Sequence, residues 1–296
     1  MVYNKTLDNK LHSLGVVENV PLSELTSFHI GGRARYLLRP RRYEDIAAAV
    51  SLCREYNVSC ILLGRGTNVL ASDRGFEGLV IRFDSPIHEP IFTDTCVIAC
   101  CGTSLMQLSR ESVKHGLSGM ERLAGIPGTV GGACAMNAGA YGGEIKQILK
   151  RIRILENDEV RWVDVTENDL GYRSSRFSFP DAIALEAEFV LSEDDGTAFA
   201  TMQDCMQKRR DKQPLELPSA GSTFKRPEGY FAGALIEQCG LKGFSIGGAQ
   251  VSEKHAGFIV NTGNATEADV RALIRHVANT VFERTGVVLE PEIKMI

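Results

Sequence analysis

One stretch of the chain limits its possible folds more than any other: the glycine-rich segment 125–140, Gly-Ile-Pro-Gly-Thr-Val-Gly-Gly-Ala-Cys-Ala-Met-Asn-Ala-Gly-Ala. Nearly every side chain in it is small, so a ligand can lie directly against bare peptide N–H groups. A second glycine-rich loop, Gly64-Arg65-Gly66-Thr67-Asn68, follows the apolar run 60–63. Two such loops beside predicted strands indicate a large ligand that carries a diphosphate; the alternative is a pair of ordinary tight turns.

The composition is that of a globular enzyme. The 296 residues are 44% hydrophobic and 24% charged, and the chain is long enough for two or three compact units. The net charge of -4 gives no basic field, so no nucleic-acid partner is expected, although a local basic subsite for an anionic ligand stays open. The segment 1–10 lacks the apolar core of a signal peptide, and no segment has the length of a membrane span. We therefore expect a cytoplasmic protein.

The cysteines give no sign of disulfides or metal. They form no paired C-x-x-C sets, and several lie within apolar strand or helix patterns. They are Cys53, Cys60, Cys96, Cys100, Cys101, Cys134, Cys205 and Cys239. This placement predicts reduced, mostly buried thiols in a reducing cytoplasm, and no bound metal.

The first two thirds of the chain read as two different patterns. A strand at 30–38, a helix at 43–56 and a buried strand at 60–63 predict a β-α-β unit. A mostly β region with one helix follows. Its strands are predicted at 79–83, 96–100, 151–155 and 182–190, and its helix at 104–115. The acidic link 192–196 is the predicted boundary to the last part.

Helices are expected next. Phe199, Met202 and Met206 fall on one face of a helix that must end before Pro214. A second helix starts at Thr266, with Asp269 as its capping-box partner, and stops at Gly286. The run 287–296 is predicted to be an edge strand because it contains a proline. The predicted domains are 1–78, 79–193 and 194–296.

The first glycine loop is close to a dinucleotide-binding fingerprint but fails it. Gly64 and Gly66 match, whereas Val69 occupies the third glycine position. A Rossmann fold also needs a helix to open here, and the segment 72–75 interrupts any helix. The loop is therefore predicted to bind phosphate in another way, with Thr67 and Asn68 able to add side-chain hydrogen bonds.

Five motifs in order resemble the UDP-N-acetylenolpyruvoylglucosamine reductase (MurB) family from about Thr26 to the C-terminus. They are the two glycine loops, Gly171-Tyr172-Arg173-Ser174-Ser175, Ala220-Gly221-Ser222-Thr223-Phe224-Lys225-Arg226-Pro227 and Leu289-Glu290-Pro291-Glu292. The resemblance implies an α+β fold, with a vanillyl-alcohol-oxidase-type (PCMH) FAD-binding domain in two subdomains and a C-terminal α+β substrate-binding domain. The distance from Arg173 to Ser222 fits the shorter, type II form of the family, which lacks an inserted loop over the substrate.

The family's reaction is NADPH-driven, FAD-dependent reduction of an enolpyruvyl ether on a UDP-sugar, giving UDP-N-acetylmuramate for peptidoglycan. Hydride addition places negative charge on the carbon that bears the carboxylate, so the site needs a cation at the carboxylate and a proton donor facing that carbon. By resemblance, Ser222 is the proton donor, Arg173 binds the carboxylate through its guanidinium fork, and Glu292 acts from the other side. On the sequence alone these would be a turn residue, a surface charge and a solvated acid. Periodicity does not separate Glu290 from Glu292.

The resemblance also assigns the binding residues. Those implied for non-covalent FAD are Gly64, Arg65, Gly66, Thr67, Asn68, Gly125, Ile126, Pro127, Gly128, Thr129, Gly131, Gly132, Ala133, Asn137, Gly139 and Ala140. Those implied for the substrate, UDP-N-acetylglucosamine enolpyruvate, are Tyr172, Lys225, Arg226, Gln250 and His255. The basic run 209–212 also supplies charge that can neutralise a diphosphate, unless it is simply a solvated face.

Two other functions stay open at this stage. Another flavin oxidase of the same domain class would share the glycine loops, and a non-enzymatic UDP-sugar binding module would need no flavin. The family reading favours a monomer with NADPH as hydride donor, no nucleic-acid partner and no membrane partner.

Overall fold

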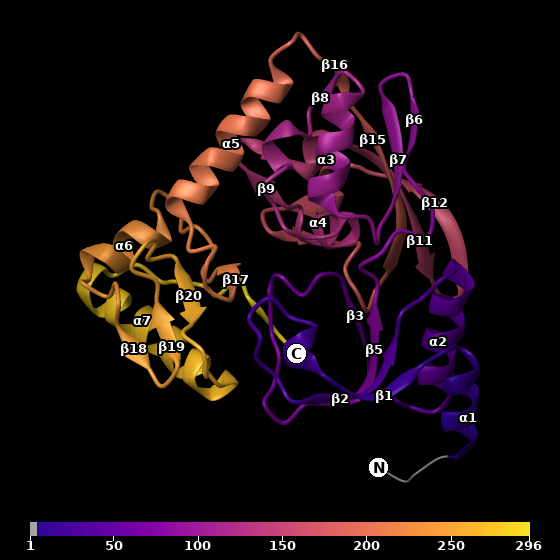
Figure 1. Ribbon diagram of the computed structural model, residues 1–296, viewed down its shortest axis with the longest axis horizontal. Helices are drawn as coiled ribbons and strands as arrows, with labels where there is room; N and C mark the ends of the chain where they lie inside the picture. The colour runs from indigo at the N-terminus through magenta and orange to yellow at the C-terminus, as the bar shows by residue number, and fades with distance from the viewer. Residues whose placement is uncertain (1–4) are drawn as a thin grey trace. The chain divides into compact units, whose positions relative to one another are not determined.

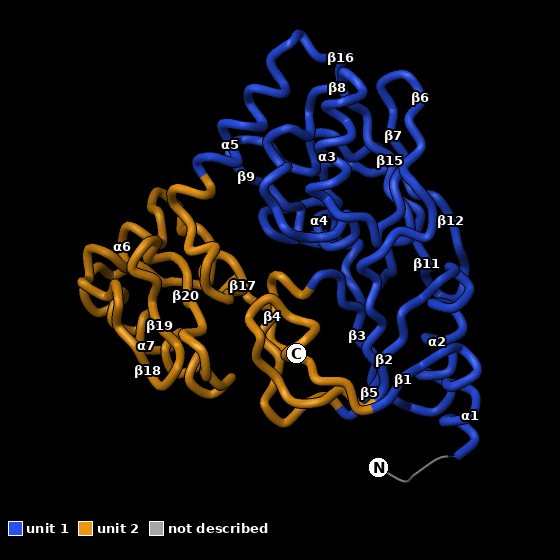
Figure 2. Tube along the Cα trace, viewed as in Figure 1, with its two compact units in different colours: residues 1–18, 36–65, 77–208 blue, residues 19–35, 66–76, 209–296 orange. Residues whose placement is uncertain are grey.

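The computed structural model describes residues 5–296, so residues 1–4 of the N-terminal segment considered above lie outside the described residues. The chain divides into two compact units and passes between them several times (Figure 2). The described part of unit 1 comprises 5–18, 36–65 and 77–208, and unit 2 comprises 19–35, 66–76 and 209–296. The three domains predicted from the sequence stay a prediction.

Unit 1 contains the helix and the second strand of the predicted β-α-β unit, together with the mostly β region (Figure 1). Its helices are α1 (Lys5–Ser13), α2 (Tyr43–Glu55), α3 (Leu105–Lys114), α4 (Val130–Met136) and α5 (Ala198–Lys212), which continues into unit 2. Its strands are β3 (Cys60–Leu63), β5 (Phe76–Arg82), β6 (Ile91–Thr93), β7 (Cys96–Cys100), β8 (Leu117–Ser118), β9 (Gly139–Ala140), β10 (Gly143–Glu144), β11 (Leu149–Glu156), β12 (Glu159–Asp164), β13 (Leu170–Gly171), β14 (Ser174–Ser175), β15 (Ile183–Val190) and β16 (Ser192–Glu193).

A five-stranded antiparallel sheet of order β12-β11-β15-β7-β6 forms the body of unit 1. Helix α4 contacts β15 and β7, and both α3 and α4 lie on the same side of the sheet (Figure 1). A single cluster of buried side chains joins the sheet to the helices, with Ile46, Leu105, Ile152 and Phe189 among its fully enclosed members. The hydrophobic effect of this burial holds the β region and the β-α-β region in one core.

Unit 2 has its own core. Its elements are β4 (Val69–Leu70), β17 (Ser219–Ser222), α6 (Ala232–Gln238), β18 (Ser245–Ile246), β19 (Ala249–Val251), β20 (Phe258–Asn261), α7 (Glu267–Thr285) and β21 (Lys294–Met295). Helix α7 contacts β18, β19 and α6, and its buried stripe includes Val270, Leu273 and Val277. Strand β21 pairs in parallel with β4 and so fixes the end of the chain beside the first glycine loop. Strands β1 (Val17–Pro21) and β2 (Arg33–Leu38), which the unit boundary divides, belong to a sheet of order β1-β2-β5-β3.

Most predicted elements are present. The helices expected at 43–56 and 104–115 are α2 and α3, and the predicted strands correspond to β3, β5, β7, β11 and β15. The capping box of α7 is confirmed, because the Thr266 side chain accepts from Asp269 N at 3.1 Å and Gly286 ends the helix at φ 72°. The cysteines are free, and all except Cys60 and Cys96 are buried, as predicted.

Three expectations were wrong in detail, and two elements near the start of the chain were missed. The first predicted strand is β2, which starts at Arg33 rather than Ile30, and neither helix α1 nor strand β1 was predicted. Phe199 is exposed, because α5 buries the face of Ala198, Met202 and Cys205 instead. The run 287–296 forms a strand only at β21, since Pro291 and its neighbours bond to the segment after Ser222.

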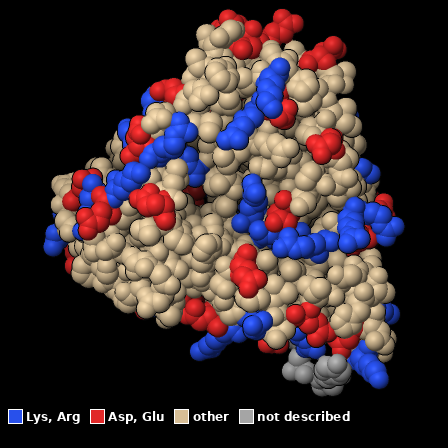
Figure 3. Space-filling model, viewed as in Figure 1, with Lys and Arg blue, Asp and Glu red and all other residues tan. Residues whose placement is uncertain are grey.

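No helix opens after the first glycine loop: β4 begins at Val69, and the described residues 71–75 that follow are neither helix nor strand. The exclusion of a Rossmann loop is therefore confirmed. Among residues 5–296, no helix is both long and apolar enough to cross a bilayer. Basic and acidic side chains lie side by side over the face shown in Figure 3, in keeping with the small net charge.

Candidate functional site

The first glycine loop joins β3 to β4, and the unit boundary falls after Arg65. In unit 1, a Cβ built on Gly64 would lie 2.6 Å from Thr129 Oγ1, and Arg65 Nη1 donates to Ser104 Oγ at 3.2 Å. The Gly64 end of the loop therefore lies directly on the second glycine loop. In unit 2, Gly66 has φ 66°, and its Cβ would lie 2.2 Å from Leu25 O.

The second glycine loop is fixed along the segment 101–105 by backbone hydrogen bonds. Leu105 N donates to Gly128 O at 3.0 Å, and Val130 N donates to Thr103 O at 2.9 Å. Thr129 then caps α4 by accepting from Gly132 N at 3.1 Å. Burial raises the pKa of the nearby Cys134 thiol to about 12, so this cysteine is protonated and unreactive at neutral pH.

Glycine is needed in the two loops for two different reasons. At Gly64, Gly66 and Gly131 a Cβ would meet protein atoms at 3.0 Å or less, so packing within the protein already requires glycine there. Gly132 differs, because its Cβ would meet only Thr129 Oγ1, at 3.4 Å, and the residue is exposed. At Gly132, then, the protein leaves a bare peptide open to a ligand, which is what close approach of a flavin nucleotide needs.

Arg173 lies at the turn between β13 and β14, at φ 54°. Its Nη2 donates to Gly139 O at 3.3 Å, and its guanidinium lies 5.4 Å from the centre of the exposed Tyr172 ring. Asn137, which ends α4 at φ 41°, donates from Nδ2 to Gly171 O at 2.9 Å. The predicted carboxylate-binding arginine is thus attached to the second glycine loop within unit 1.

Ser222 and Glu292 come together within unit 2. Ser222 is exposed at the end of β17, opposite Phe258 of β20. The next residue, Thr223, is fully buried and accepts from Glu292 N at its carbonyl at 2.8 Å. Thr223 also accepts from Ile259 N at Oγ1 at 3.0 Å, which anchors the serine loop to the sheet. No sequence signal marked Thr223 as the residue that joins the two motifs.

The structure separates the two C-terminal glutamates, which periodicity did not. Glu290 is exposed and forms an ion pair with Lys225. Glu292 is half-buried, and its carbonyl accepts from Asn68 Nδ2 at 3.3 Å. Because Lys294 N donates to Asn68 O at 3.0 Å, the first glycine loop and the C-terminal motif are bonded in unit 2.

The remaining predicted substrate residues make contacts within unit 2. Arg226 stacks its guanidinium on Phe231 at 4.0 Å, and Gln250 Nε2 donates to Gly243 O at 3.2 Å. His255 Nδ1 accepts from Gly257 N at 3.1 Å, and burial lowers the pKa of His255. The ring is therefore neutral at pH 7 with its other nitrogen protonated. These contacts leave the substrate-binding prediction untested.

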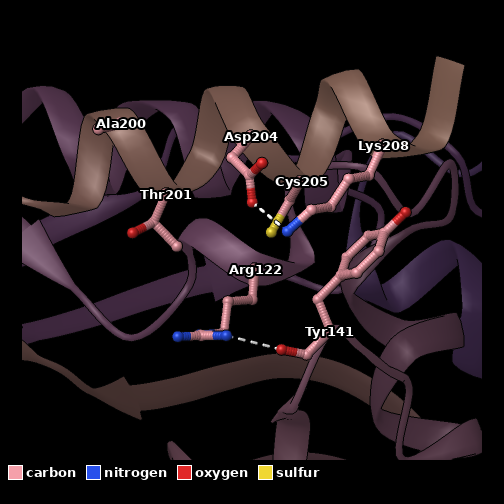
Figure 4. Close-up of a pocket in the computed structure, with 7 residues that line it drawn as sticks. All are labelled: Arg122, Tyr141, Ala200, Thr201, Asp204, Cys205 and Lys208. Atoms are coloured by element: carbon pink, nitrogen blue, oxygen red, sulfur yellow. Dashed lines mark hydrogen bonds and ion pairs between the residues drawn. The ribbon is translucent and has the colours of Figure 1, made fainter. Parts of the chain in front are cut away.

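A pocket of about 550 Å³ lies in unit 1 beside the end of the second glycine loop (Figure 4). Arg122 Nη1 donates to Tyr141 O at 2.7 Å, and Lys208 Nζ is paired with Asp204 at 2.6 Å. The lining residues are Arg122, Tyr141, Ala200, Thr201, Asp204, Cys205 and Lys208. This pocket was not predicted, because its lining residues share no motif: they come from α5, from a short 3₁₀ helix at Glu121–Leu123 and from the turn after β9.

Comparisons with known proteins agree with this geometry. A family model described as "FAD binding domain" matches residues 34–163, and one described as "UDP-N-acetylenolpyruvoylglucosamine reductase, C-terminal domain" matches residues 213–296. A UDP-N-acetylenolpyruvoylglucosamine reductase of Exiguobacterium sibiricum is 47% identical, over 95% of this chain and 93% of the relative. One of Clostridium perfringens is 43% identical, over 100% of this chain and 98% of the relative.

A solved structure gives the same relationship. The UDP-N-acetylenolpyruvylglucosamine reductase (MurB) of Thermus caldophilus superposes with a TM-score of 0.79 at 33% identity, covering 94% of this chain and 98% of that chain. Both the PCMH-type FAD-binding fold and the C-terminal domain predicted from the sequence are confirmed. The chain belongs to the UDP-N-acetylenolpyruvoylglucosamine reductase family.

Proposed function

We propose that this protein reduces the enolpyruvyl ether of UDP-N-acetylglucosamine to the lactyl ether of UDP-N-acetylmuramate, a step of bacterial peptidoglycan synthesis. The full-length relationship to reductases of this name carries the proposal. The local structure supports it, because Arg173 lies on the second glycine loop in unit 1 and Glu292 is bonded next to Ser222 in unit 2.

The two glycine loops are the proposed FAD site. The exposed peptide at Gly132 and the contact between Gly64 and Thr129 fit a flavin nucleotide that lies against small residues. When bound, FAD supplies hydride transfer to a carbon–carbon double bond. NADPH is the proposed source of the hydride.

Arg173 is the proposed partner of the substrate carboxylate. A guanidinium binds two carboxylate oxygens at once, which a lysine ammonium cannot do. The hydrogen bond to Gly139 O and the cation–π contact with Tyr172 restrict its orientation. Negative charge that develops on the adjacent carbon delocalises into this carboxylate, so the fixed cation stabilises the transition state more than the ground state.

Ser222 is the proposed proton donor to the carbon that bears the carboxylate. Its hydroxyl is exposed at the end of β17, and the buried Thr223 fixes the backbone behind it. Glu292 is proposed to act on the carboxylate from the other side. A positioned proton donor such as Ser222 contributes roughly 10²- to 10⁴-fold to a rate.

Tyr172, Lys225, Arg226, Gln250 and His255 are proposed to bind the sugar nucleotide. Lys225 and Arg226 place two cations directly after the serine motif, where a diphosphate needs neutralisation. We also propose that the enzyme works in the cytoplasm as a monomer.

The test is anaerobic stopped-flow spectroscopy of the purified protein. NADPH should bleach the flavin rapidly, and a simple alcohol should not. Rapid bleaching by an alcohol with no response to NADPH would favour an oxidase of the same domain class. A colourless protein that takes up no FAD would favour a UDP-sugar binding module.

A Arg173→Lys variant tests the carboxylate assignment. It should keep bleaching by NADPH and lose most of the reoxidation by the enolpyruvyl substrate, because a point charge does not reproduce the fork. Reoxidation at the wild-type rate would contradict the assigned role.

A further inference from the structure

Each proposed flavin loop contains one asparagine that reaches out of the loop. Asn68 in the first loop and Asn137 in the second both donate from Nδ2 to a backbone carbonyl. The acceptors are Glu292 O and Gly171 O, and each lies in a segment that carries a proposed catalytic residue. The same chemical arrangement occurs once in each unit.

In unit 2, the peptides on both sides of the Glu292 Cα are held. Its N–H donates to Thr223 O at 2.8 Å, and its carbonyl accepts from Asn68 Nδ2 at 3.3 Å. Two residues on, Lys294 N returns a hydrogen bond to Asn68 O at 3.0 Å. Asn68 is therefore hydrogen-bonded to the backbone on the C-terminal side of Glu292, and the segment after Ser222 is hydrogen-bonded to the backbone on its N-terminal side.

In unit 1, Asn137 is fully buried and both ends of its side-chain amide are used. Nδ2 donates to Gly171 O at 2.9 Å, and Oδ1 accepts from Lys146 N at 3.0 Å. Gly171 pairs with Ser174 across the turn that carries Arg173, whose own Nη2 donates to Gly139 O. The turn is thus attached to the second glycine loop at two points, once by Asn137 and once by Arg173 itself.

We propose that Asn68 and Asn137 are positioning residues for Glu292 and Arg173, an inference that rests on the proposed function. An amide fits both positions, whereas a carboxylate would turn a lone pair toward the acceptor carbonyl. Asparagine also suits φ 41° at position 137, where most side chains are strained. Through these bonds each flavin loop sets the position of one group that acts on the substrate.

The kinetic test uses Asn68→Ala and Asn137→Asp, the second keeping shape and left-handed tolerance while removing the donor. Displacement of a catalytic group by about 1 Å costs up to roughly a hundredfold. Reoxidation of the NADPH-reduced enzyme by the enolpyruvyl substrate should therefore slow by about ten- to a hundredfold. At saturating FAD, any slowing of bleaching by NADPH should be much smaller than the slowing of reoxidation, because bleaching involves no substrate carboxylate.

Double-mutant cycles show through which residue each asparagine acts. In the Glu292→Gln background, Asn68→Ala should add no further slowing, whereas in the Arg173→Lys background its effect should multiply. Asn137→Asp should show the reverse pattern. Multiplicative effects in both backgrounds would overturn the proposal, and so would defects that saturating FAD abolishes, because the asparagines would then act through FAD binding alone. Should Asn137→Asp not fold, the Asn68 cycles decide the proposal alone.

Hydrogen exchange of the flavin-free protein gives a readout independent of activity. Asn68→Ala should speed exchange at the amides of Glu292 and Lys294 several-fold and leave the middle of α7 unchanged. Unchanged exchange at the amides of Glu292 and Lys294 would overturn the proposal.

Asp73→Ala is the matched control. Asp73 Oδ1 accepts from Glu267 N at 3.0 Å, a hydrogen bond between a side chain and the backbone within unit 2 that does not involve Glu292. This variant should lower Tm without altering reoxidation, and slowing equal to that of Asn68→Ala would overturn the proposal. If Glu292→Gln and Arg173→Lys themselves leave reoxidation unchanged, the proposed function fails instead.

Discussion

The contact between the two glycine loops predicts a strong coupling between Gly64 and Thr129. A Cβ at position 64 would lie 2.6 Å from Thr129 Oγ1 and 3.3 Å from its Cγ2, and Thr129 is only 2% exposed. Because Thr129 is buried and its hydroxyl caps α4, Gly64→Ala should lower the free energy of unfolding by about 1–3 kcal/mol through overpacking. The backbone at Gly64 lies outside the left-handed region, so sterics alone set this effect.

The same distances predict that Thr129→Ala rescues the stability lost in Gly64→Ala. Thr129→Ala removes both close atoms and leaves a Cβ–Cβ separation of 3.5 Å, which is ordinary contact. By itself it removes the cap on Gly132 N and should cost about 1 kcal/mol. The double variant should therefore be about as stable as Thr129→Ala alone, giving a coupling of roughly 1–3 kcal/mol.

The double-mutant cycle consists of the wild type, Gly64→Ala, Thr129→Ala and the double variant. Urea unfolding of these four proteins, followed by circular dichroism, measures it. Thr129→Ser is the control, because it keeps Oγ and should give no rescue. Additive losses, or a loss below about 0.5 kcal/mol for Gly64→Ala, would refute the direct contact between the loops.

Three further predictions concern the site and its support. Ser222→Ala should keep bleaching by NADPH and slow reoxidation by the enolpyruvyl substrate about 10²-fold or more; an unchanged rate would remove the serine from its role. Burial holds the pKa of His255 below its ordinary value of 6.5, so the unfolded chain binds a proton more readily at this residue than the folded chain does. The contribution of His255 to stability is therefore lost as the pH falls through 6.5 toward the lower pKa of the folded protein. Tm should therefore fall less for His255→Asn than for wild type as the pH drops from about 7 to about 5, and parallel curves would contradict this. Thr266→Ala removes the cap of α7 and should cost about 1 kcal/mol in urea unfolding, while a stability equal to wild type would mean that the cap contributes nothing.

Local chemistry explains what could be predicted from the sequence. The cap at Thr266 and the stop at Gly286 depend only on residues within one helix, so both were predictable. Helix α1 was missed because its buried face has only two apolar residues, Leu7 and Leu11, and the third buried residue, Asp8, is charged. Phe199 was grouped with Met202 and Met206 by helical spacing, but the buried face of α5 runs through Ala198, Met202 and Cys205 and leaves Phe199 exposed.

Long-range bonds explain what could not be predicted. The backbone of 290–292 bonds to the segment after Ser222, so strand periodicity did not apply there. The need for glycine at Gly64 arises from Thr129, far along the chain, rather than from a ligand. Likewise, the bonds from Asn68 and Asn137 to the segments that carry the proposed catalytic residues join positions that no spacing rule relates. The motifs could be recognised, but their mutual support depends on tertiary structure.

The central claim is that the two glycine loops hold a flavin that serves reduction of an enolpyruvyl UDP-sugar. Its most direct test is the visible spectrum of the purified protein under anaerobic conditions, recorded after NADPH and again after UDP-N-acetylglucosamine enolpyruvate. The account predicts a flavin spectrum that NADPH bleaches and the enolpyruvyl substrate restores, with one UDP-N-acetylmuramate formed for each flavin reoxidised. A protein without flavin, or a bleached flavin that the enolpyruvyl substrate does not restore, would contradict it.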